Sequence, residues 1–239
     1  LHGTKHSFPT RRSSDLDDEN LKLKIEEFPN LLDEVSDSII SIKEEVKELA
    51  LDASKPTFVK KKIKEIFNLE IKTNNSKFTK TFIDKNKGTI PVYSASKFPD
   101  TVDYGYVKDN LPGIKYFENC LTWNIDGSIG KVYFRKGRFS LSEKVIPLIV
   151  NEEYKENLDL LFLKYAIQNE FSKHYFGFDN KAGKGKIQDI EISIPINEKG
   201  LFDIELQKII SEKYKKIEII KENIAEELDK ISNTEIEFE

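Results

Sequence analysis

The stretch Gly88-Thr89-Ile90-Pro91-Val92-Tyr93-Ser94-Ala95-Ser96 decides how the middle of this chain is organised. Its β-branched and aromatic residues predict a strand, and the small hydroxyl residues after them predict where that strand ends. Pro91 has no backbone N–H to give to a neighbouring strand, so we expect this strand to lie at a sheet edge or to begin there. Tyr104-Gly105-Tyr106-Val107 follows as a second aromatic and β-branched run.

Further β-rich sequence follows these two runs. Leu121 to Ile125 ends at Asp126-Gly127, a dipeptide typical of hairpin turns. Lys131 to Arg135 is the predicted return strand, and Lys136-Gly137-Arg138 is predicted to be another turn. We expect Trp123 to lie in the core and Asp126 to serve the turn, since no second acid or base stands at a telling spacing from it. Two more strand predictions complete the set, at residues 139–150 and at Ile192-Ser193-Ile194-Pro195.

Three helices are predicted from apolar spacing. One covers Asn157 to Ser172. The other two carry heptad stripes, which are typical of coiled coils. In the last of the three, isoleucines recur every seven residues. The stripes are Leu32, Val35, Ile39, Ile42, Val46 and Leu49, then Ile210, Ile217, Ile224 and Ile231.

The net charge of −4 hides a strong division along the chain. Residues 55–200 carry 25 basic and 18 acidic residues. In contrast, residues 17–54 carry 4 basic and 12 acidic residues, and residues 201–239 carry 6 basic and 11 acidic residues. A basic middle therefore lies between two acidic arms. Basic domains attract the phosphate backbone of nucleic acids, so the middle segment is the predicted binding domain.

Other functions are limited by composition. The single cysteine, Cys120, excludes an intramolecular disulfide and a cysteine-based zinc site, and three histidines give no basis for a metal cluster. No stretch approaches the ~20 apolar residues of a membrane span. Residues 1–16 include the sequence that a common sequencing adapter encodes, so we interpret them as a scar of a truncated reading frame and exclude them from the fold.

The order of these motifs resembles the target-recognition domain of type I restriction-modification specificity subunits over about residues 60–232. The same domain occurs in single-chain restriction-methylation enzymes. The resemblance implies an α+β fold, with a β-rich recognition domain at 55–200 and a packed helix. Coiled-coil-type helices at 17–54 and 201–239 would flank it. The family's glutamine-containing helix is matched by Gln207.

For function, the resemblance implies a cytoplasmic, non-catalytic module that binds double-stranded DNA and requires no cofactor. Its expected partner is a methyltransferase subunit or domain. A restriction subunit and a second recognition domain, or a second copy joined through the helices, are further expected partners.

Polar and basic residues in three stretches are the candidate DNA contacts. Asparagine amides can pair with adenine, whereas lysine and arginine meet guanine or phosphate. Solvated lysine faces and a mobile glycine-rich loop are the alternative interpretation of the same residues. The candidates are Lys72, Asn74, Asn75, Lys77 and Lys80; Lys131, Arg135 and Arg138; and Asn180, Lys181, Lys184 and Lys186.

Other functional classes stay open from the sequence. The chain could be the C-terminal part of a fused adenine methyltransferase and restriction enzyme, although no Asn/Asp-Pro-Pro-aromatic signature or glycine-rich cofactor loop occurs in it. A nuclease could be sought in Asp100 with Glu153. A coiled-coil interaction protein is a third class, and it would leave the basic middle without a purpose.

Overall fold

A computed structural model describes residues 37, 40–41 and 56–232 of the chain. The chain divides into two compact units, Ser54–Tyr214 and a second unit made of Leu1–Ala53 with Lys215–Glu239. The predicted acidic arm lies outside the described residues except for Asp37, Ile40 and Ser41, which are helical. Residues 1–16 also lie outside them.

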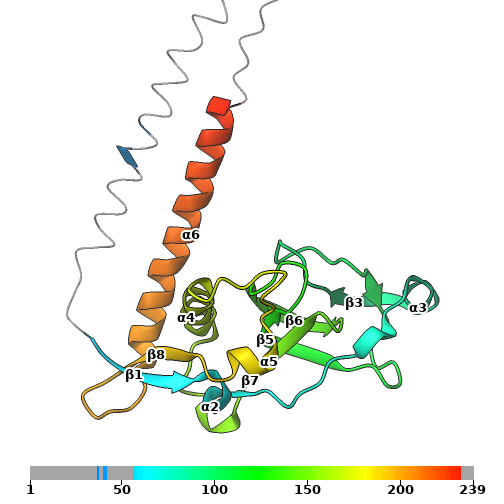
Figure 1. Cartoon of the computed structure of the whole chain (residues 1–239), viewed down its shortest axis with the longest axis horizontal. Helices are drawn as coiled ribbons and strands as arrows, with labels where there is room; N and C mark the ends of the chain where they lie inside the picture. Colours follow the sequence, from blue (N-terminus) through cyan, green and yellow to red (C-terminus); the bar gives the residue numbers. More distant parts are fainter. Residues whose placement is uncertain (1–36, 38–39, 42–55, 233–239) are drawn as a thin grey trace, which may run out of the picture. The chain divides into compact units, whose positions relative to one another are not determined.

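The larger unit begins and closes on a two-stranded antiparallel sheet. Strand β1 (Thr57–Lys62) pairs with β8 (Glu191–Ile196) over its full length. Ile192 and Ile194 of β8 are fully buried, which confirms the predicted closing strand. Figure 1 shows β1 and β8 side by side at one end of this unit, with α3 and β3 at the other end.

A six-stranded mixed sheet forms the rest of the β structure, in the order β2-β7-β5-β6-β3-β4. All pairs within it are antiparallel except β3 with β6. The strands are β2 (Phe67–Asn68), β3 (Lys87–Tyr93), β4 (Tyr106–Val107), β5 (Tyr116–Asn124), β6 (Val132–Leu141) and β7 (Val145–Val150).

Strand β3 is the predicted strand that contains Pro91, but it is not the edge strand. The edge is the short β4, whose Tyr106 lies opposite Pro91. On its other side, β3 pairs with β6 only at Val92 and Tyr93. Pro91 therefore lies one residue before that parallel pairing, where its missing N–H removes no ladder bond.

The hairpin predicted at Asp126-Gly127 is present between β5 and β6. The turn predicted at Lys136-Gly137-Arg138 is wrong, because β6 continues through it. Gly137 takes a left-handed backbone (φ 72°) opposite a register shift in β5, where its N–H donates to Asn119 Oδ1 at 2.8 Å. The glycine thus marks a β-bulge within the hairpin instead of its end.

The core lies between the sheet and helix α4 (Leu160–Ser172), the predicted packed helix. Asp159 caps this helix by accepting a hydrogen bond from the N–H of Phe162 at 2.6 Å. Leu163 and Ile167 are fully buried, and α4 packs on β5, β6 and β8. Trp123 is also fully buried, with Nε1 donating to the carbonyl of Ala182 at 3.0 Å.

Short helical elements connect the strands. These are α2 (Ile63–Ile66), η1 (Asn75–Lys77), α3 (Lys80–Lys85), η2 (Glu152–Tyr154) and α5 (Lys184–Ile187). Residues 70–81 are predicted to form one polar loop; the segment is otherwise irregular as far as Thr79, but Lys80 and Thr81 belong to α3.

Helix α6 (Ile204–Ser232) is the long helix that the isoleucine repeat predicts. Its first turns belong to the larger unit and are fastened to it by Gln207. This fully buried side chain accepts from Asp159 N at 2.9 Å and donates to the carbonyl of Asn157 at 3.0 Å. Tyr214 stacks on Tyr165 of α4 with 5.2 Å between ring centroids. The fold is therefore mixed α+β with one long C-terminal helix.

Candidate nucleic-acid interface

Asn74 organises the polar segment that follows β2. Its Oδ1 accepts from Lys115 N at 2.6 Å, and its Nδ2 donates to the carbonyls of Lys115 and Leu141, both at 3.1 Å, and to Ser140 Oγ at 2.9 Å. Only 3% of the residue is exposed. Because the carbonyl oxygen and the amide N–H₂ group both form these bonds, Asn74 ties segment 72–80 to the sheet.

Two lysines strengthen this connection. Lys77 Nζ donates to the carbonyl of Gly113 at 2.5 Å, and Lys115 Nζ donates to the carbonyl of Lys72 at 2.8 Å. Lys72, Asn75, Lys77 and Lys80 remain exposed on this segment, and Asn75 has a left-handed backbone (φ 49°). The structure therefore brings these four predicted residues together on an anchored loop.

Arg138 lies at the same end of the domain. Its Nε donates to Asp109 Oδ1 at 2.8 Å and its Nη2 to Asn110 Oδ1 at 3.2 Å, while the guanidinium lies 4.9 Å from the ring centroid of Tyr116. These contacts fix the plane of a half-exposed guanidinium.

The predicted residues at 180–186 form a second group around α5, and each is paired. Lys186 Nζ donates to Asn180 Oδ1 at 2.6 Å, and Lys181 pairs with Asp126 at 3.3 Å. The N–H of Gly127, and then Lys181, lower the pKa of the Asp126 carboxyl. Lys184 forms an ion pair with Glu70.

The Lys184–Glu70 pair joins the two groups. The hydrogen bond from Lys184 lowers the pKa of the Glu70 carboxyl, and the charge of nearby Lys72 adds to this effect. A cavity of about 340 Å³ lies beside the pair, lined by Lys64, Phe67, Asn68, Leu69, Glu70, Asn151, Lys184 and Gln188. We call the lysines along this connected surface the basic strip: Lys64, Lys72, Lys77, Lys80, Lys115 and Lys184.

Arg135 lies elsewhere, on the interior side of β6. Only 3% of it is exposed, and its guanidinium lies 3.9 Å from the ring centroid of Tyr93 and 4.9 Å from that of Tyr133. Its Nε and Nη2 have no hydrogen-bond partner in the described part of the chain. Burial lowers the pKa of Arg135.

The twelve predicted residues therefore do not form one cluster. Lys131 is exposed at the start of β6, apart from both groups. Contact of a base with Asn74 or Arg135 stays a prediction, and it would require these buried side chains to become exposed. Among the described residues, Lys80 and Lys131 form no ion pair, so their charges are available to a ligand, whereas the charge of Lys72 acts on Glu70.

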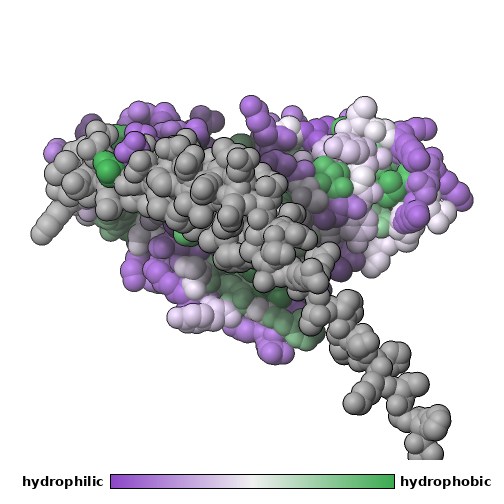
Figure 2. Space-filling model, turned by 90° about the horizontal axis from the view of Figure 1, so that it is seen from above, coloured by the Kyte–Doolittle hydropathy of each residue, from purple (hydrophilic) through white to green (hydrophobic). Residues whose placement is uncertain are grey.

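The surface seen in Figure 2 is largely hydrophilic at the end that carries α3, with separate small apolar patches. Sequence reasoning missed Lys64, Lys115, Asn68 and Gln188, because only the fold brings them beside the predicted loops. It also missed Tyr175 and Phe178, which are highly exposed. The run Tyr175-Phe176-Gly177-Phe178 in a lysine-rich loop was the signal for these two.

No group of histidine, cysteine and acidic side chains able to hold a metal ion occurs in the described ranges. Cys120 is buried, and burial raises the pKa of its thiol to about 12. None of the helices that the structure describes has the length and apolar character needed to cross a membrane.

The fold resembles that of solved specificity subunits. The S subunit of a type I restriction-modification system from M. genitalium superposes with a TM-score of 0.50 at 15% identity, covering 90% of this chain and 56% of that one. The HsdS subunit from Thermoanaerobacter tengcongensis also gives a TM-score of 0.50, at 12% identity. That match covers 88% of this chain and 50% of the HsdS subunit.

Sequence comparison leads to the same class. The type I restriction enzyme MpnII specificity subunit of Mycoplasma pneumoniae is 29% identical over 119 residues, which cover 49% of this chain and 34% of that subunit. The chain spans less than half the length of the curated relatives it matches. For another specificity subunit from that organism, the matched region is 47% of the relative's length.

These likenesses and the anchored polar loops define a target-recognition fold. Residues 56–232, more than half of the chain, match the family described as type I restriction modification DNA specificity domain. The chain belongs to this family.

Proposed function

We propose that this chain binds a specific sequence in double-stranded DNA as the specificity module of a restriction-modification system. The observation that carries the proposal is the Lys184–Glu70 contact, which joins the lysines of segment 72–80 and of α5 in one basic strip. Residues 55–200 have a net charge of +7, so the strip belongs to a domain that attracts phosphate.

The two kinds of DNA contact would come from different residues. The long, flexible lysine side chains of the basic strip suit phosphates, which position the duplex without reading its sequence. Asn75 is exposed and follows the anchored Asn74, and Arg138 is half-exposed with its guanidinium held by Asp109. An asparagine pairs with adenine and an arginine with guanine, so these two are the proposed base-reading residues.

The partners follow from the family and are proposals for this chain. A methyltransferase subunit or domain would be directed to the bound site, and a restriction subunit would join through the assembled complex. The chain covers 56% and 50% of two solved S subunits, which suits one recognition domain of such a protein. A half-size subunit that pairs with a second copy and the C-terminal part of a fused enzyme are the alternative parents.

The flanking helices are proposed to pair as a coiled coil. In α6 the stripe continues past the larger unit through Ile217 and Ile224, and Ile224 and Leu228 are exposed. A cysteine pair placed at opposite positions of residues 30–52 and α6 would test this. Oxidation should give a cross-linked monomer, whereas a cross-linked dimer would show that the helices pair between chains.

The chain itself is proposed to do no chemistry. The purified chain should neither methylate nor cleave DNA when S-adenosylmethionine and Mg²⁺ are supplied. Methyl transfer by this chain alone would overturn the proposal.

The binding test first needs the target, which methylome mapping of a host carrying the full system would supply. Titrations of the cognate and a scrambled duplex over a salt series would then measure affinity. Alanine at Lys77, Lys80, Lys184 and Lys186 together should weaken binding to both duplexes and flatten the salt dependence, because phosphate contacts release counterions. Lys199→Ala, in the turn after β8, is the control. An unchanged affinity and salt slope in the quadruple variant would show that DNA does not bind this surface.

A further inference from the structure

The loop between α4 and α5 presents two aromatic side chains to solvent. Tyr175 is 87% exposed and Phe178 is 82% exposed. Large aromatic side chains are normally covered, because each removes a large apolar area from water when it is buried. These two stand three residues apart in one loop, so both rings are accessible to a ligand.

The backbone around them is held firmly. Gly177 and Asn180 exchange two backbone hydrogen bonds of 3.1 Å, so Phe178 lies at the tip of a closed turn. Asn180 Nδ2 also donates to the carbonyl of His174 at 3.1 Å, and Asn180 Oδ1 accepts a hydrogen bond from Lys186 Nζ. Tyr175 adopts a left-handed backbone (φ 49°), which is costly for a bulky residue. Strained positions that the surrounding structure maintains are concentrated at binding sites.

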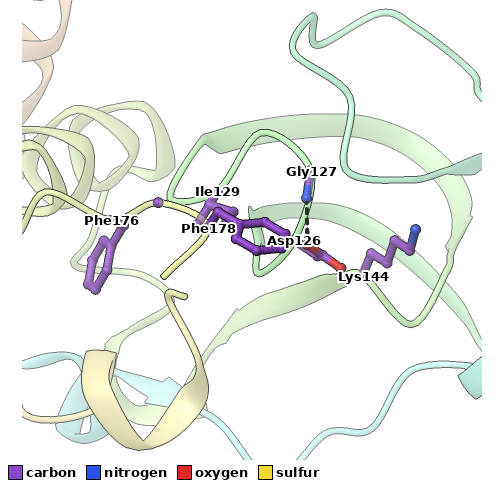
Figure 3. A pocket seen from close by; sticks show the side chains of 7 residues that line it. Asp126, Gly127, Ile129, Lys144, Phe176 and Phe178 are labelled. Atoms are coloured by element: carbon purple, nitrogen blue, oxygen red, sulfur yellow. Dashed lines mark hydrogen bonds between the residues drawn. The ribbon is translucent and has the colours of Figure 1, made fainter. Parts of the chain in front are cut away.

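A cavity lies against this turn. It has a volume of about 500 Å³ and is lined by Asp126, Gly127, Ile129, Lys144, Phe176, Gly177 and Phe178. Figure 3 shows the ring of Phe178 directed toward Asp126 and the amine of Lys144 pointing away from the aromatic rings. The volume falls within the roughly 300–1,000 Å³ typical of small-molecule sites, so a single planar ring system fits.

The walls of the cavity pack against neighbouring residues. Phe176 packs edge-on against Phe171 with 5.4 Å between ring centroids and stacks with His174 at 5.6 Å. A Cβ on Gly127 would lie 2.6 Å from the carbonyl oxygen of Ala95, so the turn that forms the opposite wall packs directly on the segment after β3. The aromatic turn is thus prepared before any ligand arrives.

Charge indicates what the ligand is. Residues 173–188 contain four lysines and one aspartate. Lys181 lies over the Phe178 ring at 5.8 Å, and Lys144 also lines the cavity, where its charge helps to lower the pKa of Asp126. Flat apolar rings surrounded by cations match a nucleic acid, whose bases stack on aromatic side chains while its phosphates meet lysines.

We propose that Tyr175 and Phe178 form a stacking element that contacts an unstacked base of the bound DNA, with the neighbouring cavity receiving that base. The inference rests on the proposed function, since it requires that the chain binds duplex DNA. It adds that binding disrupts one base step, which proteins do by inserting apolar side chains between bases.

In the experiment, the fluorescent base 2-aminopurine replaces one base of the cognate duplex at a time. Its fluorescence is measured before and after the full chain is added. At one position the wild-type chain should change the fluorescence as that base leaves the stack. A single unpaired base placed at this position should raise affinity, because the cost of unstacking is already met. The variant Tyr175→Ala with Phe178→Ala should lose both effects and bind the target about tenfold more weakly, within the range for base–aromatic stacking.

The matched control is Phe98→Ala. Phe98 is also exposed, with Lys97 over its ring at 5.6 Å, but it lies in the segment after β3. This variant should behave as the wild type does. Because all three side chains are exposed, thermal unfolding should be unchanged in both variants.

Three other results would overturn the inference. If the aromatic variant keeps wild-type affinity and fluorescence, the aromatic turn does not contact a base, while the proposed function stands. If the variant binds DNA normally but loses the methyltransferase subunit, the turn is a protein interface. If the wild-type chain binds no duplex, the proposed function itself fails.

Discussion

Lys184 and Glu70 form an ion pair although 114 positions separate them in the chain. The contact joins α5 to the segment after β2, and it places a carboxylate within the basic strip. A negative charge there opposes the approach of phosphate, so Glu70 should limit how tightly the strip binds DNA.

Glu70→Gln should therefore strengthen DNA binding several-fold at low salt, and the gain should decrease as salt screens the charge. Titrations of cognate and scrambled duplexes at several salt concentrations would measure it. Glu198→Gln, in the turn after β8, is the control and should have no effect. A weaker affinity for Glu70→Gln would mean that the pair orients Lys184 toward the DNA and that this role exceeds repulsion.

Lys80 has no side-chain partner in the described part of the chain, so its full charge is available to a phosphate. Lys80→Ala should weaken binding to every duplex and lower the slope of log affinity against log salt by about one. Arg138→Ala should instead cost about 1–3 kcal/mol on the target and little on a scrambled duplex. Equal losses on both duplexes would count against base reading by Arg138.

Asn74 and Asn75 are adjacent but should respond in opposite ways. Asn74→Ala removes the buried bonds to Ser140 and Leu141 and the part-buried bond from the N–H of Lys115, so it should lower the free energy of unfolding by about 3 kcal/mol. Asn75→Gly removes the side-chain amide but suits the left-handed backbone, so it should leave unfolding nearly unchanged and reduce only binding to the target. Thermal unfolding and titration of both variants would separate the two roles, and a stable Asn74→Ala protein would contradict the anchoring role.

Cys120 gives a prediction about pH. The thiol is 5% exposed, and burial raises its pKa from an ordinary 9.0 to about 12. Below pH 9 the thiol is protonated in both states and has no effect on stability. Above pH 9 the thiol of the unfolded chain loses its proton first. The free energy of unfolding should therefore decrease by about 1.4 kcal/mol per pH unit until about pH 12.

Unfolding of the wild type and of Cys120→Ala between pH 8 and pH 10.5 would measure this difference, since other groups titrate equally in both proteins. The same burial should protect the native thiol from alkylation. Identical pH profiles for the two proteins would show that the thiol becomes exposed before unfolding.

Local sequence patterns were enough for most of the secondary structure. Asp126-Gly127 identified the β5–β6 hairpin, apolar spacing identified α4, and the isoleucine repeat identified α6. Such patterns work because turn preference and helical periodicity depend on residues close together in the chain. The turn predicted at Gly137 was wrong for the same reason, since a glycine that permits a left-handed backbone suits a bulge as well as a turn.

The candidate site was only partly predictable. From the residues alone it follows that the basic charge lies in the middle domain and that the motifs follow the family's order. Only the tertiary structure decided that Asn74 and Arg135 are buried, that Lys184 meets Glu70, and that Tyr175 and Phe178 stand in solvent. Burial and pairing depend on which distant segments pack together. Asn74 and Asn75 are the same residue type, but only Asn74 lies where β6 and the turn before β5 surround it.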